Sequence, residues 1–455
     1  MNLDGSTIAA STGGRLIADA PAGPICTDTR ALTEGGWFLA LIGDRFDGHD
    51  FLEHAAAAGA AGCVVSRAPE PGSWSGGVVV VDDTTEALAA LGRHVREGFD
   101  GPVIGLTGSS GKTTTRALIA LALSPLGRIH QTEGNLNNHL GVPMTLLATP
   151  PDAAAMVIEM GTSSPGEIEH LARLVEPTIR LIVNVGPAHL EELGGLDGVA
   201  VEKGALFTTA SPGHSCCVNV EDERVAAIEL PAGVRRITFG AGGDVSLQGV
   251  QIKPSSLQTD AVYETPAGTI EAHIPAPGRH VALNAAGALA VALATGVDLR
   301  AAADALSGYL PVGMRMRPET LSSGAVALND AYNANPQSME ASLKVLAAMP
   351  GRRAAVLGDM LELGPDEAAW HERIAQLAGE LALELVILVG PRMAAAAGAC
   401  RGTQVLAFVE ATGAIEPLRA WLQQGDVVLL KGSRGARVEQ VLQGLTGEPG
   451  SRGSH

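Results

Sequence analysis

The Gly-rich segment at residues 107–114 constrains the fold of this chain more than any other feature. It has the sequence Thr-Gly-Ser-Ser-Gly-Lys-Thr-Thr, follows an apolar run at residues 103–106 and precedes an expected helix at residues 113–123. A turn of this kind points several backbone N–H groups at one spot, and the helix N-terminus adds partial positive charge. The segment therefore predicts a nucleotide phosphate loop between a buried strand and a helix of an α/β domain.

The residue types in the loop suit phosphate binding. Gly108 and Gly111 let the backbone approach phosphates without a Cβ clash, Lys112 can reach the β and γ oxygens, and the Thr113 hydroxyl can bind Mg²⁺. The alternative is a Gly-rich turn before an ordinary helix, and the general pattern G-x-x-x-x-G-K-[ST] is met imperfectly because Leu106 stands where its first glycine is required. The expected nucleotide contacts are Thr107, Gly108, Ser109, Ser110, Gly111, Lys112, Thr113 and Thr114.

The loop alone leaves GTPases, kinases, transport ATPases and ligases open as classes. The sequence has no Asn-Lys-x-Asp motif, which weakens the GTPase interpretation. An expected strand at residues 155–158 is followed by Glu159, whose carboxylate is suited to hold a metal ion beside the loop. Taken alone, Glu159 could equally be a charge at a strand end that faces water.

Length and charge limit the domain count and the partners. At about 150 residues per domain, a chain of 455 residues should form roughly three domains. The formal net charge of −18 repels phosphate backbones and anionic lipid, so we expect no nucleic-acid partner and no membrane partner. Residues 1–14 show no signal-peptide pattern, which favours a cytoplasmic protein. The cysteines lack metal-ligand spacing and are expected to be buried or half-buried thiols: Cys26, Cys63, Cys216, Cys217 and Cys400.

Apolar runs alternate with helical spacing along the chain, which indicates mostly parallel α/β sheets. We expect three regions, at residues 1–98, 99–312 and 313–455, with Pro311, Val312 and Gly313 as a hinge. Strands are expected at residues 37–42, 63–65, 78–81, 103–106, 156–159, 181–185, 216–220, 325–328, 354–357, 385–389 and 427–430. Helices are expected at residues 51–62, 85–96, 113–123 and 283–294, a small antiparallel addition at residues 234–277, and a frayed end at residues 450–455.

Further short blocks follow the loop in a fixed order. They are residues 132–143 (Thr-Glu-Gly-Asn-Leu-Asn-Asn-His-Leu-Gly-Val-Pro), Glu159, residues 184–190 (Asn-Val-Gly-Pro-Ala-His-Leu) and residues 202–204 (Glu-Lys-Gly). Later blocks are Gly278-Arg279-His280 with Asn284, then Arg315, Asp330 and residues 431–434 (Lys-Gly-Ser-Arg). In order and spacing these blocks resemble those of the Mur ligases of peptidoglycan synthesis, and the resemblance covers nearly the whole chain.

The resemblance implies an ATP-dependent ligase with three domains: a small N-terminal α/β domain, a central P-loop parallel-sheet ATPase domain and a C-terminal Rossmann-like α/β domain. It implies catalytic roles for Lys112, Glu159, His189 and Lys203, of which the last is carbamylated in the family. It implies that a pair of Mg²⁺ ions is held by Thr113, Glu159, His189 and the modified Lys203. It also implies that ATP contacts Asn284, Arg315 and Asp330. Taken singly, His189 could be an ordinary core or surface histidine and Lys203 a solvated helix lysine.

Two C-terminal segments, at residues 330–339 and 357–364, are similar to those of the family member that joins D-alanyl-D-alanine to UDP-N-acetylmuramoyl-tripeptide. Residues 27–30 and 47–51 resemble that member's pocket for the UDP end of its substrate. The substrate contacts that the resemblance implies are Thr29, Arg30, Asp47, Asn135, Asn137, Asn138, Asn333, Asn335 and Lys431, and we expect a monomer. The sequence departs from the family at Thr162-Ser163-Ser164, where many members carry an Asn-His pair, and at Asn329, where an acid is common.

These residues suit one reaction in particular. A carboxylate is a poor electrophile until it receives the γ-phosphoryl group of ATP, and that transfer brings anions together, so the site must neutralise charge. An amine can then attack the acyl phosphate and expel phosphate. Two alternatives stay open: a relative that adds a diamino acid or a γ-glutamyl unit, as folylpolyglutamate synthase does, and a nucleotide-binding regulator that has lost ligation.

Overall fold

The computed structural model describes residues 1–447 of the chain, and the expected frayed end at residues 450–455 lies outside them. These residues divide into two units. The first unit comprises Met1–Leu106, Leu126–Thr162 and Glu167–Ile179. The second unit comprises Thr107–Pro125, Ser163–Gly166 and the chain from Arg180 onward.

A mixed six-stranded sheet begins the first unit, in the order β1-β3-β4-β7-β8-β2. Its central pairs are parallel and its two edge pairs antiparallel. Trp37, Leu88 and Leu91 are fully buried between the sheet and its helices. The strands are β1 (Asn2–Leu3), β2 (Arg15–Ala18), β3 (Gly23–Cys26), β4 (Trp37–Leu39), β7 (Gly62–Val65) and β8 (Gly77–Val80), and a separate hairpin consists of β5 (Ile42–Gly43) and β6 (Phe46–Asp47). The helices are α1 (Gly5–Thr12), α2 (Leu52–Ala57) and α3 (Thr84–Glu97).

The middle of the chain contributes strands to both units. In the first unit, β10 (Arg128–Gln131), β11 (Ala153–Glu159) and β9 (Val103–Thr107) are neighbours in that order and run parallel. Every residue of β9 is buried, as in a parallel sheet covered on both faces. The helices here are α5 (Gly141–Leu147), which packs against α3, and α6 (Glu167–Val175).

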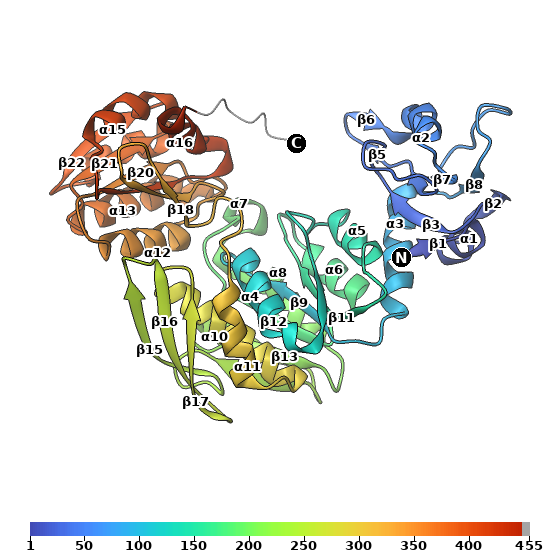
Figure 1. Ribbon diagram of the computed structural model, residues 1–455, viewed down its shortest axis with the longest axis horizontal. Coiled ribbons are helices and arrows are strands. Elements are labelled where there is room, and N and C mark those ends of the chain that lie inside the picture. Colours follow the sequence, from blue (N-terminus) through green and yellow to red (C-terminus); the bar gives the residue numbers. More distant parts are fainter. Residues whose placement is uncertain (448–455) are drawn as a thin grey trace. The chain divides into compact units, whose positions relative to one another are not determined.

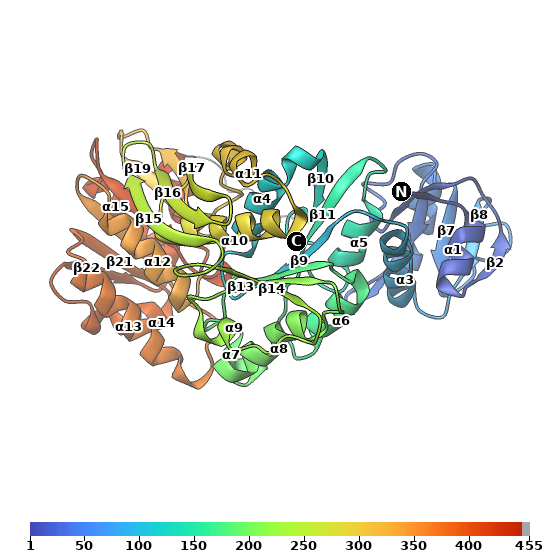
Figure 2. The same ribbon diagram turned by 90° about the horizontal axis from the view of Figure 1, so that it is seen from below.

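In the second unit, β12 (Ile179–Ile182), β13 (Ser215–Asn219) and β14 (Arg235–Phe239) are neighbours in that order. Helices α4 (Lys112–Ala122), α10 (Arg279–Thr295) and α11 (Leu299–Ala305) lie side by side (Figure 2). The other helices of this part are α7 (Leu190–Leu193), α8 (Leu196–Thr208) and α9 (Glu223–Ala226). Because α10 is rich in alanine, its backbone can pack closely on the neighbouring elements, and Ala282, Ala285 and Ala286 are completely buried.

An antiparallel three-stranded sheet also packs against α10 (Figure 1). Its strands are β15 (Ser246–Lys253), β16 (Gln258–Thr265) and β17 (Gly268–Ile274). The alternating burial along β17 fits a sheet with one face on the core and the other in water.

The C-terminal part has a six-stranded sheet in the order β18-β19-β23-β20-β21-β22, parallel except for the edge pair β18–β19. Helices α12 and α13 cover one face, and α15 and α16 cover the other (Figure 1). The strands are β18 (Arg317–Thr320), β19 (Val326–Asp330), β20 (Arg353–Gly358), β21 (Leu385–Val389), β22 (Gln404–Phe408) and β23 (Val427–Lys431). The helices are α12 (Pro336–Ala347), α13 (Glu367–Glu380), α14 (Pro391–Ala395), α15 (Ile415–Trp421) and α16 (Glu439–Thr446).

The α/β class with mostly parallel sheets is confirmed, and most expected strands and helices form within a few residues of their predicted bounds. The strand expected at residues 181–185 forms at Ile179–Ile182. The Val183 N–H still donates to the Thr107 carbonyl at the end of β9, and the Val185 N–H then donates to Asp222. The helix expected at residues 51–62 ends at Ala57, and Gly59 turns the chain with a φ of +83°. Strand β14 was expected in the antiparallel addition but pairs in parallel with β13.

Two further expectations concern thiols and membranes. All five cysteines are free, Cys26 partly buried and the other four buried, as predicted. None of the helices within residues 1–447 combines the length and the apolar character that crossing a membrane requires.

Candidate functional site

The phosphate loop connects β9 to α4 as the sequence predicts. Gly111 is the N-cap of α4 and has a φ of +76°, in the left-handed region that favours glycine. A Cβ at Gly108 would lie 2.9 Å from the Cβ of Val183, so a larger residue would displace the neighbouring strand end. The ammonium of Lys112 donates to the carbonyl oxygen of Gly108 at 2.8 Å, which holds the charge across the loop.

Two serines hold the loop against residues 184–186. The Ser109 hydroxyl donates to the Gly186 carbonyl at 2.9 Å and accepts from the Gly186 N–H at the same distance. The Ser110 N–H donates to the Asn184 side-chain oxygen at 3.0 Å. The predicted ATP contact Asn284 also lies beside the loop, since a Cβ on Gly111 would be 3.1 Å from its amide nitrogen.

The start of α12 reaches the same loop. Asn335 caps this helix by accepting from the Ser338 N–H at 2.9 Å, and its amide nitrogen donates to the Ser109 carbonyl at 3.3 Å. The Ser110 hydroxyl donates to Gln337 Oε1 at 3.2 Å. Gln337 was not predicted as a site residue, although it lies inside the segment at residues 330–339 that resembles the Mur ligases.

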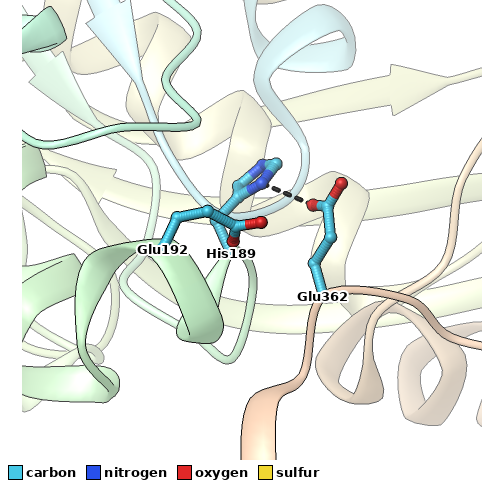
Figure 3. Close-up of side chains that lie close together, drawn as sticks. All are labelled: His189, Glu192 and Glu362. Atoms are coloured by element: carbon cyan, nitrogen blue, oxygen red, sulfur yellow. Dashed lines mark ion pairs between the residues drawn. The ribbon is translucent and has the colours of Figure 1, made fainter.

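His189 ends the segment after β12 and lies directly before α7. Its Nδ1 is 2.6 Å from Glu362 Oε2, and Glu192 lies close by, so the ligand atoms of the three side chains lie within 4.8 Å of one another (Figure 3). The contact with His189 lowers the pKa of Glu362, against a smaller opposing effect of burial. Sequence analysis predicted His189 but neither glutamate.

Lys203 lies on α8 with only 1% of its surface exposed. Burial lowers the pKa of its ammonium from 10.5 to about 7, and the positive charge of Lys112 acts in the same direction, while Glu202 opposes them. The interpretation of Lys203 as a solvated lysine is therefore wrong. The Glu202 carboxylate accepts from the Gly166 N–H at 2.6 Å.

Predicted ATP and substrate residues of the C-terminal part gather at the ends of β19 and β23. Lys431 Nζ is 2.6 Å from Asp330 Oδ2 in a nearly buried ion pair, and it also donates to the Asn333 carbonyl at 3.2 Å. Burial lowers the pKa of the adjacent His280 to about 4. The negative charge of Asp330 opposes this shift, and the positive charge of Lys431 adds a smaller effect in the same direction as burial. The Arg315 guanidinium stacks 3.8 Å above the centre of the Tyr332 ring. Asn329 stands at a position where an acid is common in the family, and its side-chain amide donates to Glu319 at 3.0 Å.

The first unit holds Glu159 and the predicted asparagines. Glu159 is 2% exposed, its backbone N–H donates to the Thr132 hydroxyl at 2.9 Å, and its Oε1 accepts from the Asn137 amide at 2.9 Å. Asn138 uses its side chain to accept from the Gly141 N–H at 2.9 Å, a turn-forming role. Asn135 is exposed.

The three predicted residues for the UDP end of the substrate also lie in the first unit. Arg30 pairs with Asp28 at 2.7 Å, and Thr29 lies between them in sequence. Asp47 pairs with Arg67 at 2.6 Å, and hydrogen bonds from Arg67 and the His49 N–H lower its pKa. Arg67 was not predicted, because no motif marks a basic residue that follows the buried strand β7.

Comparisons with known proteins identify the family. The family described as Mur ligase middle domain matches residues 106–292, and the family described as Mur ligase, glutamate ligase domain matches residues 314–434. The UDP-N-acetylmuramoyl-tripeptide–D-alanyl-D-alanine ligase of Escherichia coli (strain K12) is 36% identical over 434 residues, 94% of each chain. The ligase of the same name from Bacillus subtilis (strain 168) is 34% identical over 93% of each chain.

Solved structures show the same fold. The crystal structure of MurF from Acinetobacter baumannii has a TM-score of 0.90 and 33% identity, and the match covers 98% of this chain and 99% of that one. The MurF ligase from Thermotoga maritima, solved in complex with ADP, has a TM-score of 0.82 and 28% identity, with 94% and 97% covered. Together with the phosphate loop and the ordered blocks that follow it, these matches show that the chain belongs to the Mur ligase family.

Proposed function

We propose that this chain joins D-alanyl-D-alanine to UDP-N-acetylmuramoyl-tripeptide in an ATP-dependent reaction that releases ADP and phosphate. The observation that carries the proposal is the 36% identity with the Escherichia coli ligase of that name across 94% of both chains. The ADP complex of the Thermotoga maritima relative supports ATP as the phosphoryl donor.

The loop and Lys112 supply the first requirement, which is to neutralise the charge of the γ-phosphate as it meets the substrate carboxylate. The start of α4 offers backbone N–H groups and partial positive charge to a phosphate, and Lys112 adds a full positive charge. The Lys112 ammonium donates to the Gly108 carbonyl at 2.8 Å. A phosphate oxygen is a stronger acceptor than a neutral carbonyl, so the side chain has a reason to turn to it.

The donor set fits Mg²⁺. The hydroxyl of Thr113, the carboxylate of Glu159, the ring of His189 and a carbamate on Lys203 would hold the ions, and Glu159 is a buried carboxylate whose Oε1 is held by Asn137. When bound, Mg²⁺ neutralises charge on the phosphoryl group and on the carboxylate that receives it. We propose this set as the metal site.

The burial of Lys203 supports the carbamate that we propose on this lysine. A neutral amine nitrogen attacks the carbon of CO₂, forms a C–N bond and loses one proton, which leaves an anionic carbamate. Only the neutral amine can react in this way, and burial lowers the pKa of Lys203 to about 7, so the neutral form is well populated near neutral pH. The product replaces a cation that would repel a metal with an oxygen donor that attracts it.

The acceptor side of the reaction is assigned to the C-terminal part. We propose that Asn333, Asn335 and Lys431 contact the substrates there, that Asn284, Arg315 and Asp330 contact ATP, and that Thr29, Arg30 and Asp47 contact the UDP end. Asn135, Asn137 and Asn138 would contact the muramoyl peptide. The proposed functional regions are residues 1–98, 99–312 and 313–455, in a cytoplasmic monomer.

Phosphate release tests this assignment directly. With purified protein, ATP and the tripeptide nucleotide, release should depend on added D-alanyl-D-alanine, and single amino acids should give little. A preference for meso-diaminopimelate, lysine or glutamate as the amine would mean that the chain has the activity of another member of the family. ATP binding without release under any of these conditions would mean a nucleotide-binding protein that has lost ligation.

A further inference from the structure

His189 and Glu362 form a contact between two segments that lie far apart in the sequence. His189 lies between β12 and α7, and Glu362 lies after β20 in the C-terminal part (Figure 3). The two side chains meet with 2.6 Å between His189 Nδ1 and Glu362 Oε2, although the oxygen lies off the line of a Nδ1–H bond. Glu362 is half exposed, so the contact is not a by-product of core packing.

The backbone on both sides fixes this contact. The Leu190 N–H donates to the Glu362 carbonyl at 2.9 Å, and the side chain of Leu190 packs against the core under α12 and α13. His189 and Glu362 both have left-handed backbones, with φ values of +55° and +63°. Non-glycine residues keep such conformations where the surroundings over-determine them. The carboxylate is therefore placed beside the imidazole by the chain path and not by a chance surface pairing.

Imidazole chemistry gives the contact a consequence. A neutral imidazole carries its proton on one nitrogen and offers the other as a ligand, and the hydrogen bond at one nitrogen decides which. The negative charge of a carboxylate 2.6 Å from Nδ1 favours the proton on that nitrogen and leaves the Nε2 lone pair for a metal. Histidines that bind metals commonly donate their second ring N–H to a carboxylate in this way, which fixes both the tautomer and the ring orientation.

We propose that Glu362 is a positioning residue that prepares His189 to bind a metal ion through Nε2. The proposal rests on the metal role proposed above for His189. Because Glu362 follows the Pro311–Gly313 segment in the chain, the C-terminal part supplies the carboxylate that orients His189. Metal binding at His189 is thereby coupled to the docking of residues 358–364 on α7.

The tautomer of His189 is the first measurement. In protein labelled with ¹⁵N-histidine, long-range ¹H–¹⁵N spectra distinguish Nδ1–H from Nε2–H, and His189→Gln assigns the signal among the 12 histidines. At a pH where the ring is neutral and without metal, the wild type should show Nδ1–H. Glu362→Leu should move the ring to the Nε2–H form that free imidazole side chains favour. Glu362→Gln retains an acceptor oxygen and should move it less.

Mn²⁺ binding, followed by electron paramagnetic resonance of the free ion, is the second measurement. Loss of such a partner typically weakens metal affinity by about 10- to 100-fold, and we expect Glu362→Leu to fall in that range. Glu362→Gln should lose less. Glu191→Leu removes one carboxylate from the exposed surface of the same helix, α7, and should bind Mn²⁺ as the wild type does.

Each result separates this inference from the metal proposal. An unchanged tautomer in Glu362→Leu overturns the positioning role, including the case where Mn²⁺ affinity falls, since Glu362 would then ligate the ion directly. Equal loss of affinity in Glu191→Leu would reduce the effect to surface charge and also overturn it. If His189→Gln binds Mn²⁺ as tightly as the wild type, His189 does not bind the metal. Glu362 would then fix the tautomer of His189 without preparing a metal ligand.

Discussion

Lys112 places a single positive charge in the phosphate loop. Its ammonium contacts the Gly108 carbonyl, and its half-buried stem starts α4. We expect Lys112→Ala to lower ligation by about 10²- to 10³-fold or more, the range seen when one charge-stabilising donor is removed from a transition state. Phosphate release at saturating substrates measures this. An unchanged thermal unfolding midpoint is the control, and near-normal turnover would place the nucleotide elsewhere.

Lys203 gives a pH dependence whose sign can be worked out. Its pKa is lowered to about 7, so the neutral amine dominates above that pH and the ammonium below it. The carbamate should therefore form above pH 7 and decline as the pH falls through about 7. In ¹³C-bicarbonate, the carbamate resonance should follow this course and be missing in Lys203→Ala. A carbamate resonance that persists in Lys203→Ala would belong to another amine.

At the scale of secondary structure elements, the helix α12 and the phosphate loop form one assembly. Gln337 accepts from the Ser110 hydroxyl, and a Cβ on Gly186 would lie 2.5 Å from the same Gln337 oxygen. One such hydrogen bond contributes about 0.5–1.5 kcal/mol, so Gln337→Met should raise the KM for ATP by roughly 2- to 10-fold. The KM and kcat for ATP are measured at saturating levels of the other substrates.

A matched control for this variant exists on α13. Gln376 is exposed, and its side-chain amide donates to Glu380 on the same helix at 2.8 Å. Gln376→Met therefore makes the same replacement away from the loop. It should leave the KM for ATP unchanged. An equal rise in the KM for ATP in both variants would show that the contact of Gln337 with the loop does not contribute to ATP binding.

The elements also show what the sequence can and cannot predict. The phosphate loop, α10 and the buried strands were predictable, because each is contiguous and its periodicity or glycine spacing is local. Gln337, Glu362 and Arg67 were not, because their partners are distant in the chain and a lone Gln, Glu or Arg has no local signature. The end of β12 at Ile182 was missed for the same reason, because the partners of the residues that follow it, Ser109 and Asp222, lie on distant segments.

At the scale of the whole molecule, the proposed reaction requires the C-terminal part to move. Water must be kept from the acyl phosphate, while ATP and the amine must enter and ADP must leave. The segment Pro311-Val312-Gly313 suits a hinge, since Gly313 has a φ of +61° and adopts it without a Cβ penalty. Gln337 contacts the phosphate loop, and Glu362 contacts His189 directly before α7.

We therefore expect small-angle scattering curves to change when ATP and the tripeptide nucleotide are added together, because residues 313–455 reorient about Gly313 to enclose them. A non-hydrolysable ATP analogue should give the same change, since enclosure precedes phosphoryl transfer. The Lys112→Ala protein is the control: if its loop no longer holds the nucleotide, its curve should stay as in the free protein. Curves from the wild type that superimpose with and without both ligands would mean that the reaction proceeds with the C-terminal part held where Gln337 and Glu362 place it.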